Sequence, residues 1–530
     1  MIRFVKEWNK TVLVGFTIII LAFVLRLYNL NSLPIFVDEA IYVRWAQVMR
    51  AEQTLRFLPL SDGKQPLFMW SIIPFLKIFS DPLFAGRFLS VLTGIGTLVG
   101  IFVSSFYLFR SKKVALIASF IYAISPFSVF FDRMALVDSM LTMFGVWTFF
   151  FGVLTARTLR LDFAMLAGFA LGGAMLTKSP ALFFAILLPT TWILSDWPKT
   201  KALISKKRIV HLIKLALLFL VTFLIGYGLF NILRLGPEFH MIALRNKDYV
   251  YPLGHLLQRP LDPILPFLDR ILEYFWILGP SVLVVFIALG FLFNIKKRPK
   301  EIILLAVWAM LPIVVISEFS KTMTTRYIYF TAPFLMILGA LIFFWRGKWE
   351  KLLTVGLIVF IFHSFTINRL ILTDVENAPL PRSERSGYLE EWTAGTGIKE
   401  VAEFLREEKT REPDKGMVVG TEGFFGTLPD GLQIYLNDLT DVIVIGVGVI
   451  MTELHPSLIE SKQAGNKTYL VVNSSRFKFD AEEAGLDLLA AYPKAFRAQN
   501  THEYSLHGPR DTLYFFEVTE EAISSKSGQL

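Results

Sequence analysis

The sequence contains no cysteine and few charged side chains. None of its 530 residues is Cys, so the chain can form no disulfide and offers no thiolate to a metal. Only 18% of its residues are Asp, Glu, Lys or Arg, whereas soluble proteins contain about 25%. Together with the 54% share of hydrophobic residues, this shortage of charge excludes an ordinary soluble globular protein.

Metal-ligand spacing and a nucleic-acid-binding patch are also lacking. His240 and His255 lie in one loop, but no close His/Asp/Glu spacing typical of a metal site surrounds them. The net charge is +9, yet the basic residues form short clusters between apolar segments instead of one patch. We expect no nucleic-acid partner, no metal and no cofactor; a divalent metal has no support from any motif.

Apolar windows long enough to cross about 30 Å of hydrocarbon recur through the first 372 residues. They predict a polytopic all-α membrane domain, residues 1–372, with about eleven spans. The predicted spans are 11–30, 84–108, 114–131, 136–156, 162–177, 180–195, 211–233, 274–293, 302–317, 327–345 and 352–370. The segment 66–79 is shorter and contains Pro74 and Lys77, so we expect it to be re-entrant or interfacial.

The basic clusters predict the orientation of the chain in the membrane. With eleven spans, the clusters all fall on the side of the N-terminus, which the positive-inside rule makes cytoplasmic. These clusters are Arg3/Lys6/Lys10, Arg110/Lys112/Lys113, Arg157/Arg160, 199–208, 296–300 and Arg346/Lys348/Lys351. We therefore predict a multi-pass protein of the plasma membrane whose C-terminal tail lies outside the cell.

The tail after about residue 385 has a different composition. Charged residues alternate with short apolar runs such as "GMVVG" and "KTYLVVNS", which is typical of helices and strands in a soluble domain. We predict a small extracytoplasmic α/β domain over residues 385–530. It carries two sequons, at Asn466 and Asn473, which are potential glycosylation sites.

Two adjacent acids, Asp38 and Glu39, follow the first span in the stretch "PIFVDEAIYVRWAQ". One interpretation is structural: Asp38 caps a helix and Glu39 favours the positive end of its dipole. The other is catalytic, because Lys64, Asp138 and Arg326 are predicted to lie at the same membrane face. Ionisable residues at membrane segments are costly and tend to be functional. Both interpretations can hold together.

These residues occur in motifs that carry a family resemblance. The "DE" pair, "KQPL", "DRMALVDS", "TKSPAL" and "RYIYFTAP" occur in this order. The chain resembles GT-C-fold integral membrane glycosyltransferases that use a polyprenyl-phosphate sugar donor, the relatives of protein O-mannosyltransferases and lipid A aminoarabinose transferases. In the family, the second motif usually reads Lys-Pro-Pro-Leu and the fourth Lys-Gly-Pro. This chain has Gln65 and Ser179 at the differing positions.

The residue types fit glycosyl transfer. Asp38 is the expected base toward an acceptor hydroxyl, and Glu39 would orient the acceptor or tune Asp38. A single displacement with one base implies inversion at the anomeric carbon. Lys64 and Arg326 are the expected ligands of the leaving phosphate, joined by Arg133.

Three further residues have open roles. Asp138 would hold Arg133 or the sugar hydroxyls, or else cap a helix. Lys178 would take part in a substrate loop with Tyr327, or only anchor a short turn at the head-group level.

Two other functions are open at this point: a secondary transporter, or a non-catalytic membrane scaffold that displays the C-terminal domain. A transporter predicts polar groups at mid-helix and paired repeats with broken helices. A scaffold leaves Asp38, Lys64, Asp138 and Arg326 unexplained. The sequence does not select the sugar, a hexose or a pentose. It leaves protein, glycan and lipid acceptors open. Membrane lipid is a further expected partner, because the chain is predicted to span the membrane.

Overall fold

The computed structural model describes residues 2–200, 205–344 and 349–523. They form two compact units, each of which is described by itself. The helical unit comprises Met1–Leu30, Thr54–Ser71 and Arg87–Pro381, and the mixed unit comprises Asn31–Gln53, Ile72–Gly86 and Arg382–Leu530. Residues 31–53 and 72–86 thus group with the C-terminal part of the chain. Three basic residues used for the predicted orientation, Lys201, Arg346 and Lys348, lie outside the described residues.

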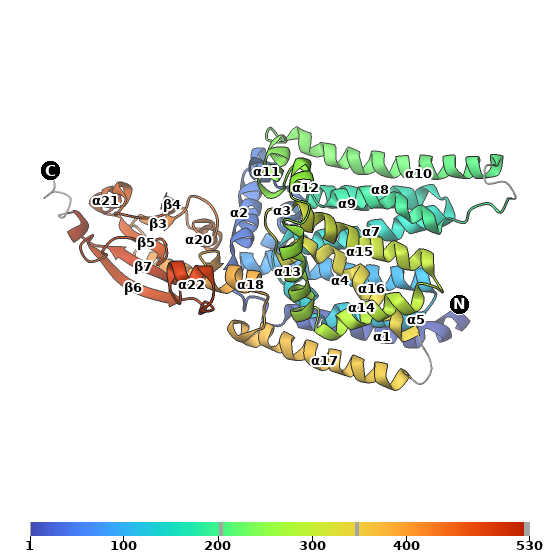
Figure 1. The fold of residues 1–530 in the computed structure, drawn as a ribbon. Helices are drawn as coiled ribbons and strands as arrows, with labels where there is room; N and C mark the ends of the chain where they lie inside the picture. The colour runs from blue at the N-terminus through green and yellow to red at the C-terminus, as the bar shows by residue number, and fades with distance from the viewer. Residues whose placement is uncertain (1, 201–204, 345–348, 524–530) are drawn as a thin grey trace. The chain divides into compact units, whose positions relative to one another are not determined.

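Long apolar helices dominate the helical unit (Figure 1). Within the described ranges, seven are long and apolar enough to cross a membrane. They lie in α1 (Ile2–Leu27), α4 (Pro82–Phe109), α7 (Val137–Thr158), α10 (Lys206–Phe230) with η5 (Asn231–Leu235), α15 (Pro299–Phe319), η6 (Thr325–Thr331) with α16 (Ala332–Ala340) and η7 (Leu341–Phe344), and α17 (Glu350–Thr373). The chain is therefore a multi-pass membrane protein.

The remaining predicted spans correspond to shorter or bent helices. α13 (Ile264–Ile277) and α14 (Ser281–Asn294) meet at 105°, so they count as an eighth span only if the pair crosses as one. Four other elements are too short to cross a membrane as single straight helices: α8 (Leu161–Thr177), the stretch Ala181–Leu194, α5 (Lys112–Ile124) and α6 (Pro126–Phe131). The predicted total of eleven is thus not confirmed, although each predicted segment contains an apolar helix.

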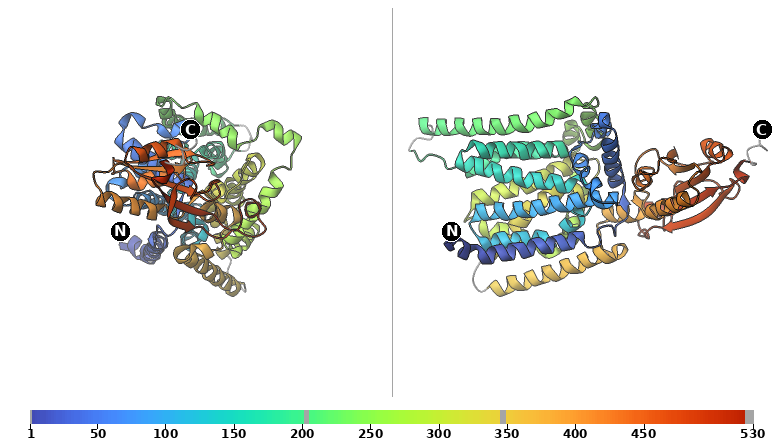
Figure 2. Two further views of the ribbon diagram at one scale, coloured as in Figure 1. Left: turned by 90° about the vertical axis from the view of Figure 1, so that its left-hand side faces the viewer. Right: turned by 180° about the vertical axis from the view of Figure 1, so that it is seen from behind.

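Small residues let three helices of this unit approach closely. A Cβ atom on Gly172 of α8 would lie 2.4 Å from the Leu229 side chain of α10, and one on Gly173 would lie 2.5 Å from Phe144 of α7. The Thr222 hydroxyl of α10 donates to the Ala164 carbonyl of α8 at 2.8 Å. Close packing through small residues is a common way for helices to associate in lipid. Figures 1 and 2 show α7, α8 and α10 side by side.

Short elements connect the long helices. Those before α4 are η1 (Gln53–Leu55), η2 (Leu58–Asp62), α3 (Leu67–Ile72) and η3 (Phe75–Lys77). Those after it are α9 (Ala181–Leu187), η4 (Leu188–Leu194), α11 (Met241–Tyr249), α12 (Leu253–Gln258) and η8 (Val375–Asn377). The segment predicted as re-entrant or interfacial is the short apolar helix Leu67–Lys77.

The mixed unit contains a five-stranded sheet with the strand order β4-β3-β5-β7-β6. β3 is parallel to β4 and β5, whereas β7 is antiparallel to β5 and β6. The strands are β3 (Met417–Glu422), β4 (Val442–Gly448), β5 (Lys467–Asn473), β6 (Leu486–Pro493) and β7 (Thr512–Val518). The helices are α18 (Arg382–Arg385), the π-helix η9 (Ser386–Glu390), α19 (Ile398–Arg411), α20 (Asp430–Leu436), α21 (Pro456–Gln463) and α22 (His502–His507). Helices between parallel strands make this part α/β in type.

A two-stranded ladder joins an N-terminal segment to this unit. β1 (Ile35–Phe36) pairs antiparallel with β2 (Ala394–Gly395). A Cβ atom on Gly395 would lie 2.4 Å from the Ile35 side chain, so the close approach requires glycine. β1 leads directly into α2 (Val37–Ala51), where Gln47 donates to the Ile434 carbonyl of α20 at 2.8 Å. The acidic pair at the start of α2 is thereby held within the mixed unit.

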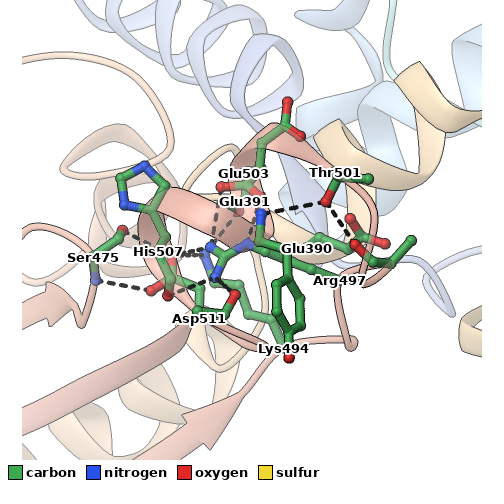
Figure 3. Close-up of polar contacts among 12 residues, drawn as sticks. Glu390, Glu391, Ser475, Lys494, Arg497, Thr501, Glu503, His507 and Asp511 are labelled. Carbon is green, nitrogen blue, oxygen red and sulfur yellow. Dashed lines mark hydrogen bonds and ion pairs between the residues drawn. The ribbon is translucent and has the colours of Figure 1, made fainter.

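Buried charges fasten the start of the C-terminal segment to the sheet (Figure 3). Arg497 donates to both carboxylate oxygens of Glu391, at 2.7 and 3.1 Å, and Lys494 donates to the Glu391 carbonyl at 2.9 Å. The Lys494 ammonium also lies 3.9 Å from Asp511. Burial lowers the pKa of Lys494 to about 8, although the Asp511 carboxylate acts in the opposite direction.

Candidate active site

An ion pair joins the start of α7 to the end of α8. Lys178 Nζ donates to Asp138 Oδ1 at 2.7 Å. The Asp138 side chain is 3% exposed, and its other oxygen, Oδ2, is buried with no hydrogen-bond partner among the described residues. The Lys178 side chain is 23% exposed. Because an unpaired buried oxygen is costly, a carboxylate held this way is suited to accepting a ligand hydroxyl.

The segment η6 brings Arg326 and Tyr327 to this pair. Lys178 Nζ lies 5.4 Å from the centre of the Tyr327 ring, and Arg326 Cζ lies 5.8 Å from the same ring. Both cations are within cation–π distance of one ring. The structure therefore brings together four of the predicted site residues, Asp138, Lys178, Arg326 and Tyr327, from three separate segments.

Lys64 lies in a tight turn that is braced by α11. Gly63 has φ +69°, and a Cβ atom there would lie 2.7 Å from both Arg245 Cβ and the Met241 carbonyl oxygen. Asp62 accepts a hydrogen bond from Arg245 Nε at 2.9 Å and lies 3.3 Å from Lys64 Nζ. These contacts fix the backbone directly before Lys64, whose side chain is 25% exposed. No motif or spacing indicates Arg245, because it lies 183 residues from Asp62.

The Lys64 turn and the Lys178 turn contact each other through their neighbouring residues. Gln65 Nε2 donates to Ser179 Oγ at 2.9 Å. These are the two positions at which the chain differs from the family motifs. The turn of Lys64 is thus attached to the group formed by Asp138, Lys178, Arg326 and Tyr327.

Arg133 has a different position from the one predicted. Its side chain is fully buried, and it donates to backbone carbonyls at the end of α1: Arg26 at 2.9 Å, Tyr28 at 2.7 Å and Asn29 at 2.7 Å. Arg133 therefore holds the C-terminal end of α1 in place, and we do not include it among the phosphate ligands proposed below. The alternative that Asp138 pairs with Arg133 is also wrong, because Asp138 pairs with Lys178.

Asp132, in the same turn as Asp138, has all its hydrogen-bonding capacity filled. Oδ2 accepts from Arg26 Nε and the Tyr122 hydroxyl, both at 2.9 Å. Oδ1 accepts from the Ser139 hydroxyl at 2.6 Å and the Tyr329 hydroxyl at 2.8 Å. These donors come from four helical segments, and no sequence spacing predicted them. Asp132 therefore ties helices together, whereas Asp138 retains an oxygen for a ligand.

Asp38 and Glu39 lie in the first turn of α2, within the mixed unit. The helix begins at Val37, so its N-cap is Phe36, and Glu39 Oε2 accepts from the Phe36 amide at 3.0 Å. The expectation that Asp38 caps the helix is therefore wrong: Glu39 caps it, from the third helical position. Glu39 is fully buried and Asp38 is half-buried. Glu39 has a structural role, and the case for Asp38 as a base is independent of capping.

The predictions on the two sequons and on a metal site can also be compared with the structure. Asn473 is 1% exposed and its amide donates to Glu422 at 2.7 Å, so this sequon is inaccessible in the folded unit. Asn466 is half-buried. Among the described residues, no three His, Cys, Asp or Glu side chains group as metal ligands do. Metal-independent catalysis stays a prediction.

Comparison with known proteins supports the resemblance read from the motifs. Residues 63–226 match the family model described as dolichyl-phosphate-mannose-protein mannosyltransferase. That range contains Lys64, Asp138 and Lys178, but neither Asp38 nor Arg326. No curated protein sequence matches the chain.

Solved structures show the same fold along nearly the whole chain. The apo crystal structure of ArnT from Cupriavidus metallidurans matches with a TM-score of 0.59 and 14% identity, covering 98% of this chain and 99% of ArnT. The crystal structure of the same protein bound to undecaprenyl phosphate matches with a TM-score of 0.57 and 14% identity, covering 97% and 99%. The chain therefore has the fold of ArnT, and the predicted resemblance is confirmed.

Proposed function

We propose that the chain is a glycosyltransferase that moves a sugar from a polyprenyl-phosphate donor to an acceptor hydroxyl at the outer face of the plasma membrane. The observation that carries the proposal is the ion pair of Lys178 and Asp138, with Arg326 at the same Tyr327 ring. Two cations beside a carboxylate with an unpaired oxygen suit a ligand that has both a phosphate and hydroxyl groups. The match to the mannosyltransferase family model and the fold of ArnT, which binds undecaprenyl phosphate, agree with this chemistry.

The reaction is a single displacement. The acceptor oxygen forms a bond to the anomeric carbon, and the bond from that carbon to the phosphate oxygen breaks. The phosphate leaves with the electron pair, and the acceptor proton passes to the Asp38 carboxylate, acting as general base. One displacement inverts the anomeric configuration.

The other residues have supporting roles in this proposal. Lys64 and Arg326 stabilise the charge that develops on the leaving phosphate, Arg326 as a planar fork and Lys64 as a compact charge. Asp138 Oδ2, which has no hydrogen-bond partner among the described residues, accepts hydrogen bonds from hydroxyls of the sugar, and Oδ1 holds Lys178 at the phosphate. Tyr327 lines the site as a ring beside both Lys178 and Arg326.

The proposal is tested by incubating the purified full chain with labelled polyprenyl-phosphate sugars, both hexoses and pentoses, and membrane extracts. Label should move from one donor to a protein, glycan or lipid acceptor, and the labelled product identifies the acceptor class. If none of the donors is consumed and none binds, the proposal is wrong.

A further inference from the structure

Two Lys-X-Pro segments of the helical unit are joined to each other at their middle residues. Lys64-Gln65-Pro66 leads into α3, and Lys178-Ser179-Pro180 connects α8 to α9. Gln65 Nε2 donates to Ser179 Oγ at 2.9 Å across 114 residues of sequence. Gln65 is 4% exposed, so water competes little for this bond. Lys64 directly precedes Gln65 in the sequence, and Lys178 directly precedes Ser179.

Both segments have a stiff backbone on either side of that bond. The backbone of Gln65 has a narrowed range because a residue before proline is biased toward extended conformations. Ser179 lies in a turn that is closed by a hydrogen bond from the Ala181 amide to the Lys178 carbonyl at 3.1 Å. Lys64 follows the braced Gly63 turn, and its own amide donates to the Pro59 carbonyl at 3.0 Å. Lys178 closes α8, and its amide donates to the Ala174 carbonyl at 3.1 Å. Fixing the two middle residues therefore fixes the two lysine Cα atoms, since neighbouring Cα atoms are about 3.8 Å apart.

The two lysine side chains are themselves directed by acids. Lys178 Nζ is 2.7 Å from Asp138, and Lys64 Nζ is 3.3 Å from Asp62. Both are about one quarter exposed, at 23% and 25%, so they remain accessible to a ligand. A lysine ammonium is a point charge on a flexible stem, so its value for a ligand depends on how well its backbone is held.

We propose that Gln65 is a positioning residue: through Ser179, it sets the spacing of Lys64 and Lys178 so that both ammonium groups contact one phosphate group of the donor. This inference rests on the proposed function, which places Lys178 at the phosphate, and adds how the spacing of Lys178 and Lys64 is set. Two cations already in place bind an anion without reorganisation when it arrives. Gln65 acts through the lysines, so its loss should change phosphate binding without changing the charge of the site.

The test is the binding of undecaprenyl phosphate to the purified full chain in lipid nanodiscs. Lys64→Met and Lys178→Met should each weaken binding because each removes a cation. Gln65→Leu keeps the size and removes the donor, and it should raise Kd about tenfold, the effect expected for losing one buried hydrogen bond. Ser179→Ala should do the same, Ser179→Thr should bind as the native chain does, and Gln65→Leu/Ser179→Ala should be no weaker than either single variant.

Positioning is separated from a general loss of stability in two ways. Asn368→Leu removes another buried hydrogen bond of the helical unit, to the Ile124 carbonyl at 2.7 Å, and should lower the melting temperature without changing Kd. In the Gln65→Leu background, Lys178→Met should cost less binding than it does in the native chain. Equal costs in both backgrounds, or normal binding by Gln65→Leu while both lysine variants bind weakly, would overturn the inference alone. If the native chain binds undecaprenyl phosphate but neither lysine variant changes Kd, the inference is wrong and both lysines leave the phosphate site. If the native chain itself does not bind undecaprenyl phosphate, the proposed function is wrong.

Discussion

Lys178 holds one carboxylate oxygen of Asp138 at 2.7 Å and leaves the other without a hydrogen-bond partner among the described residues. Six residues earlier, Asp132 accepts four hydrogen bonds from side chains of four segments. Two aspartates of one short turn thus have opposite surroundings. This difference assigns Asp138 to ligand binding and Asp132 to the packing of the helices.

The same substitution at these two positions should have opposite effects. Asp138→Asn weakens the hold on Lys178 and should lower turnover about 10²-fold, as misplacement of a binding group by about 1 Å can do, with little change in melting temperature. Asp132→Asn leaves the buried Arg26 without its counter-charge and should destabilise the protein by about 3–5 kcal/mol. Turnover per folded molecule and melting temperature distinguish the two. Equal effects of both variants on both quantities would contradict the assignment.

Neutralising the proposed phosphate ligands should act on the donor. Lys64→Met and Arg326→Met should each raise the donor KM about tenfold or more and leave acceptor selectivity unchanged, because a charge pair is about four times stronger at an effective dielectric of 20 than in water. Arg160→Met removes an exposed arginine paired with Asp162 and serves as the matched control. Unchanged donor KM and turnover in both site variants would remove these residues from the site.

The lowered pKa of Lys494 predicts how the stability of the mixed unit depends on pH. Its pKa in the folded chain is about 8, lowered by burial from an ordinary value of 10.5, so between these values the unfolded chain binds more protons than the folded chain. The stability of the unit should therefore rise from pH 8 toward 10, by up to about 1.4 kcal/mol per pH unit for one proton.

Two other groups of the mixed unit, Tyr469 and Lys467, have a raised pKa and affect stability mainly above this pH range. The pKa of Tyr469 is raised by burial from 10.0 to about 12, so the stability that this group contributes is lost above about pH 10. The pKa of Lys467 is also raised: burial lowers it, but hydrogen bonds to Glu408 and Glu412 outweigh that effect. The stability that Lys467 contributes is therefore lost above about pH 10.5. Pulse proteolysis in urea at pH 8.0, 9.0 and 9.5 measures the slope. Lys494→Met should abolish it and the exposed control Lys399→Met should keep it; a slope that survives Lys494→Met assigns it to another group.

The predicted orientation can be mapped directly because the native chain has no cysteine. Lys207→Cys, in the loop predicted to be cytoplasmic, should resist a membrane-impermeant thiol reagent in intact cells, and Asn500→Cys should react. Both positions are exposed in the folded protein. After the cells are opened, both should react, which controls for accessibility. Reaction at 207 and protection at 500 in intact cells would invert the topology.

Local sequence signals predicted the elements of the fold well. Seven predicted spans coincide with helices that are long enough to cross a membrane, because a window of about 20 apolar residues is read without knowledge of packing. The shorter helices, such as α8, were counted as full spans on their apolar composition: the predicted segment 162–177 agrees with α8 to within one residue, but it is shorter than about 20 residues. The cap of α2 was misassigned by two positions: the extended pairing of Phe36 with Ala394 starts the helix at Val37.

The contacts within the site depended on tertiary structure and could only partly be predicted. The motifs pointed to Lys64, Asp138, Lys178 and Arg326, because charged residues at membrane segments are rare. They did not separate Asp132 from Asp138 or reveal that Arg133 binds backbone carbonyls. The bond of Gln65 to Ser179 lies between two departures from the motifs, and neither motif by itself indicates that these residues meet. Pairs separated by more than 100 residues leave no spacing to read.

The central claim is tested most directly by measuring the release of polyprenyl phosphate from a polyprenyl-phosphate sugar in the presence of acceptor, for the native chain and for Asp38→Asn. Asp38 is not the helix cap, so its replacement by Asn should leave the melting temperature unchanged. We predict that the native chain releases polyprenyl phosphate in step with an inverted glycosylated product, and that Asp38→Asn is slower by about 10² or more, the typical effect of a positioned base. No release by the native chain, or equal release and transfer by a folded Asp38→Asn variant, would contradict the account.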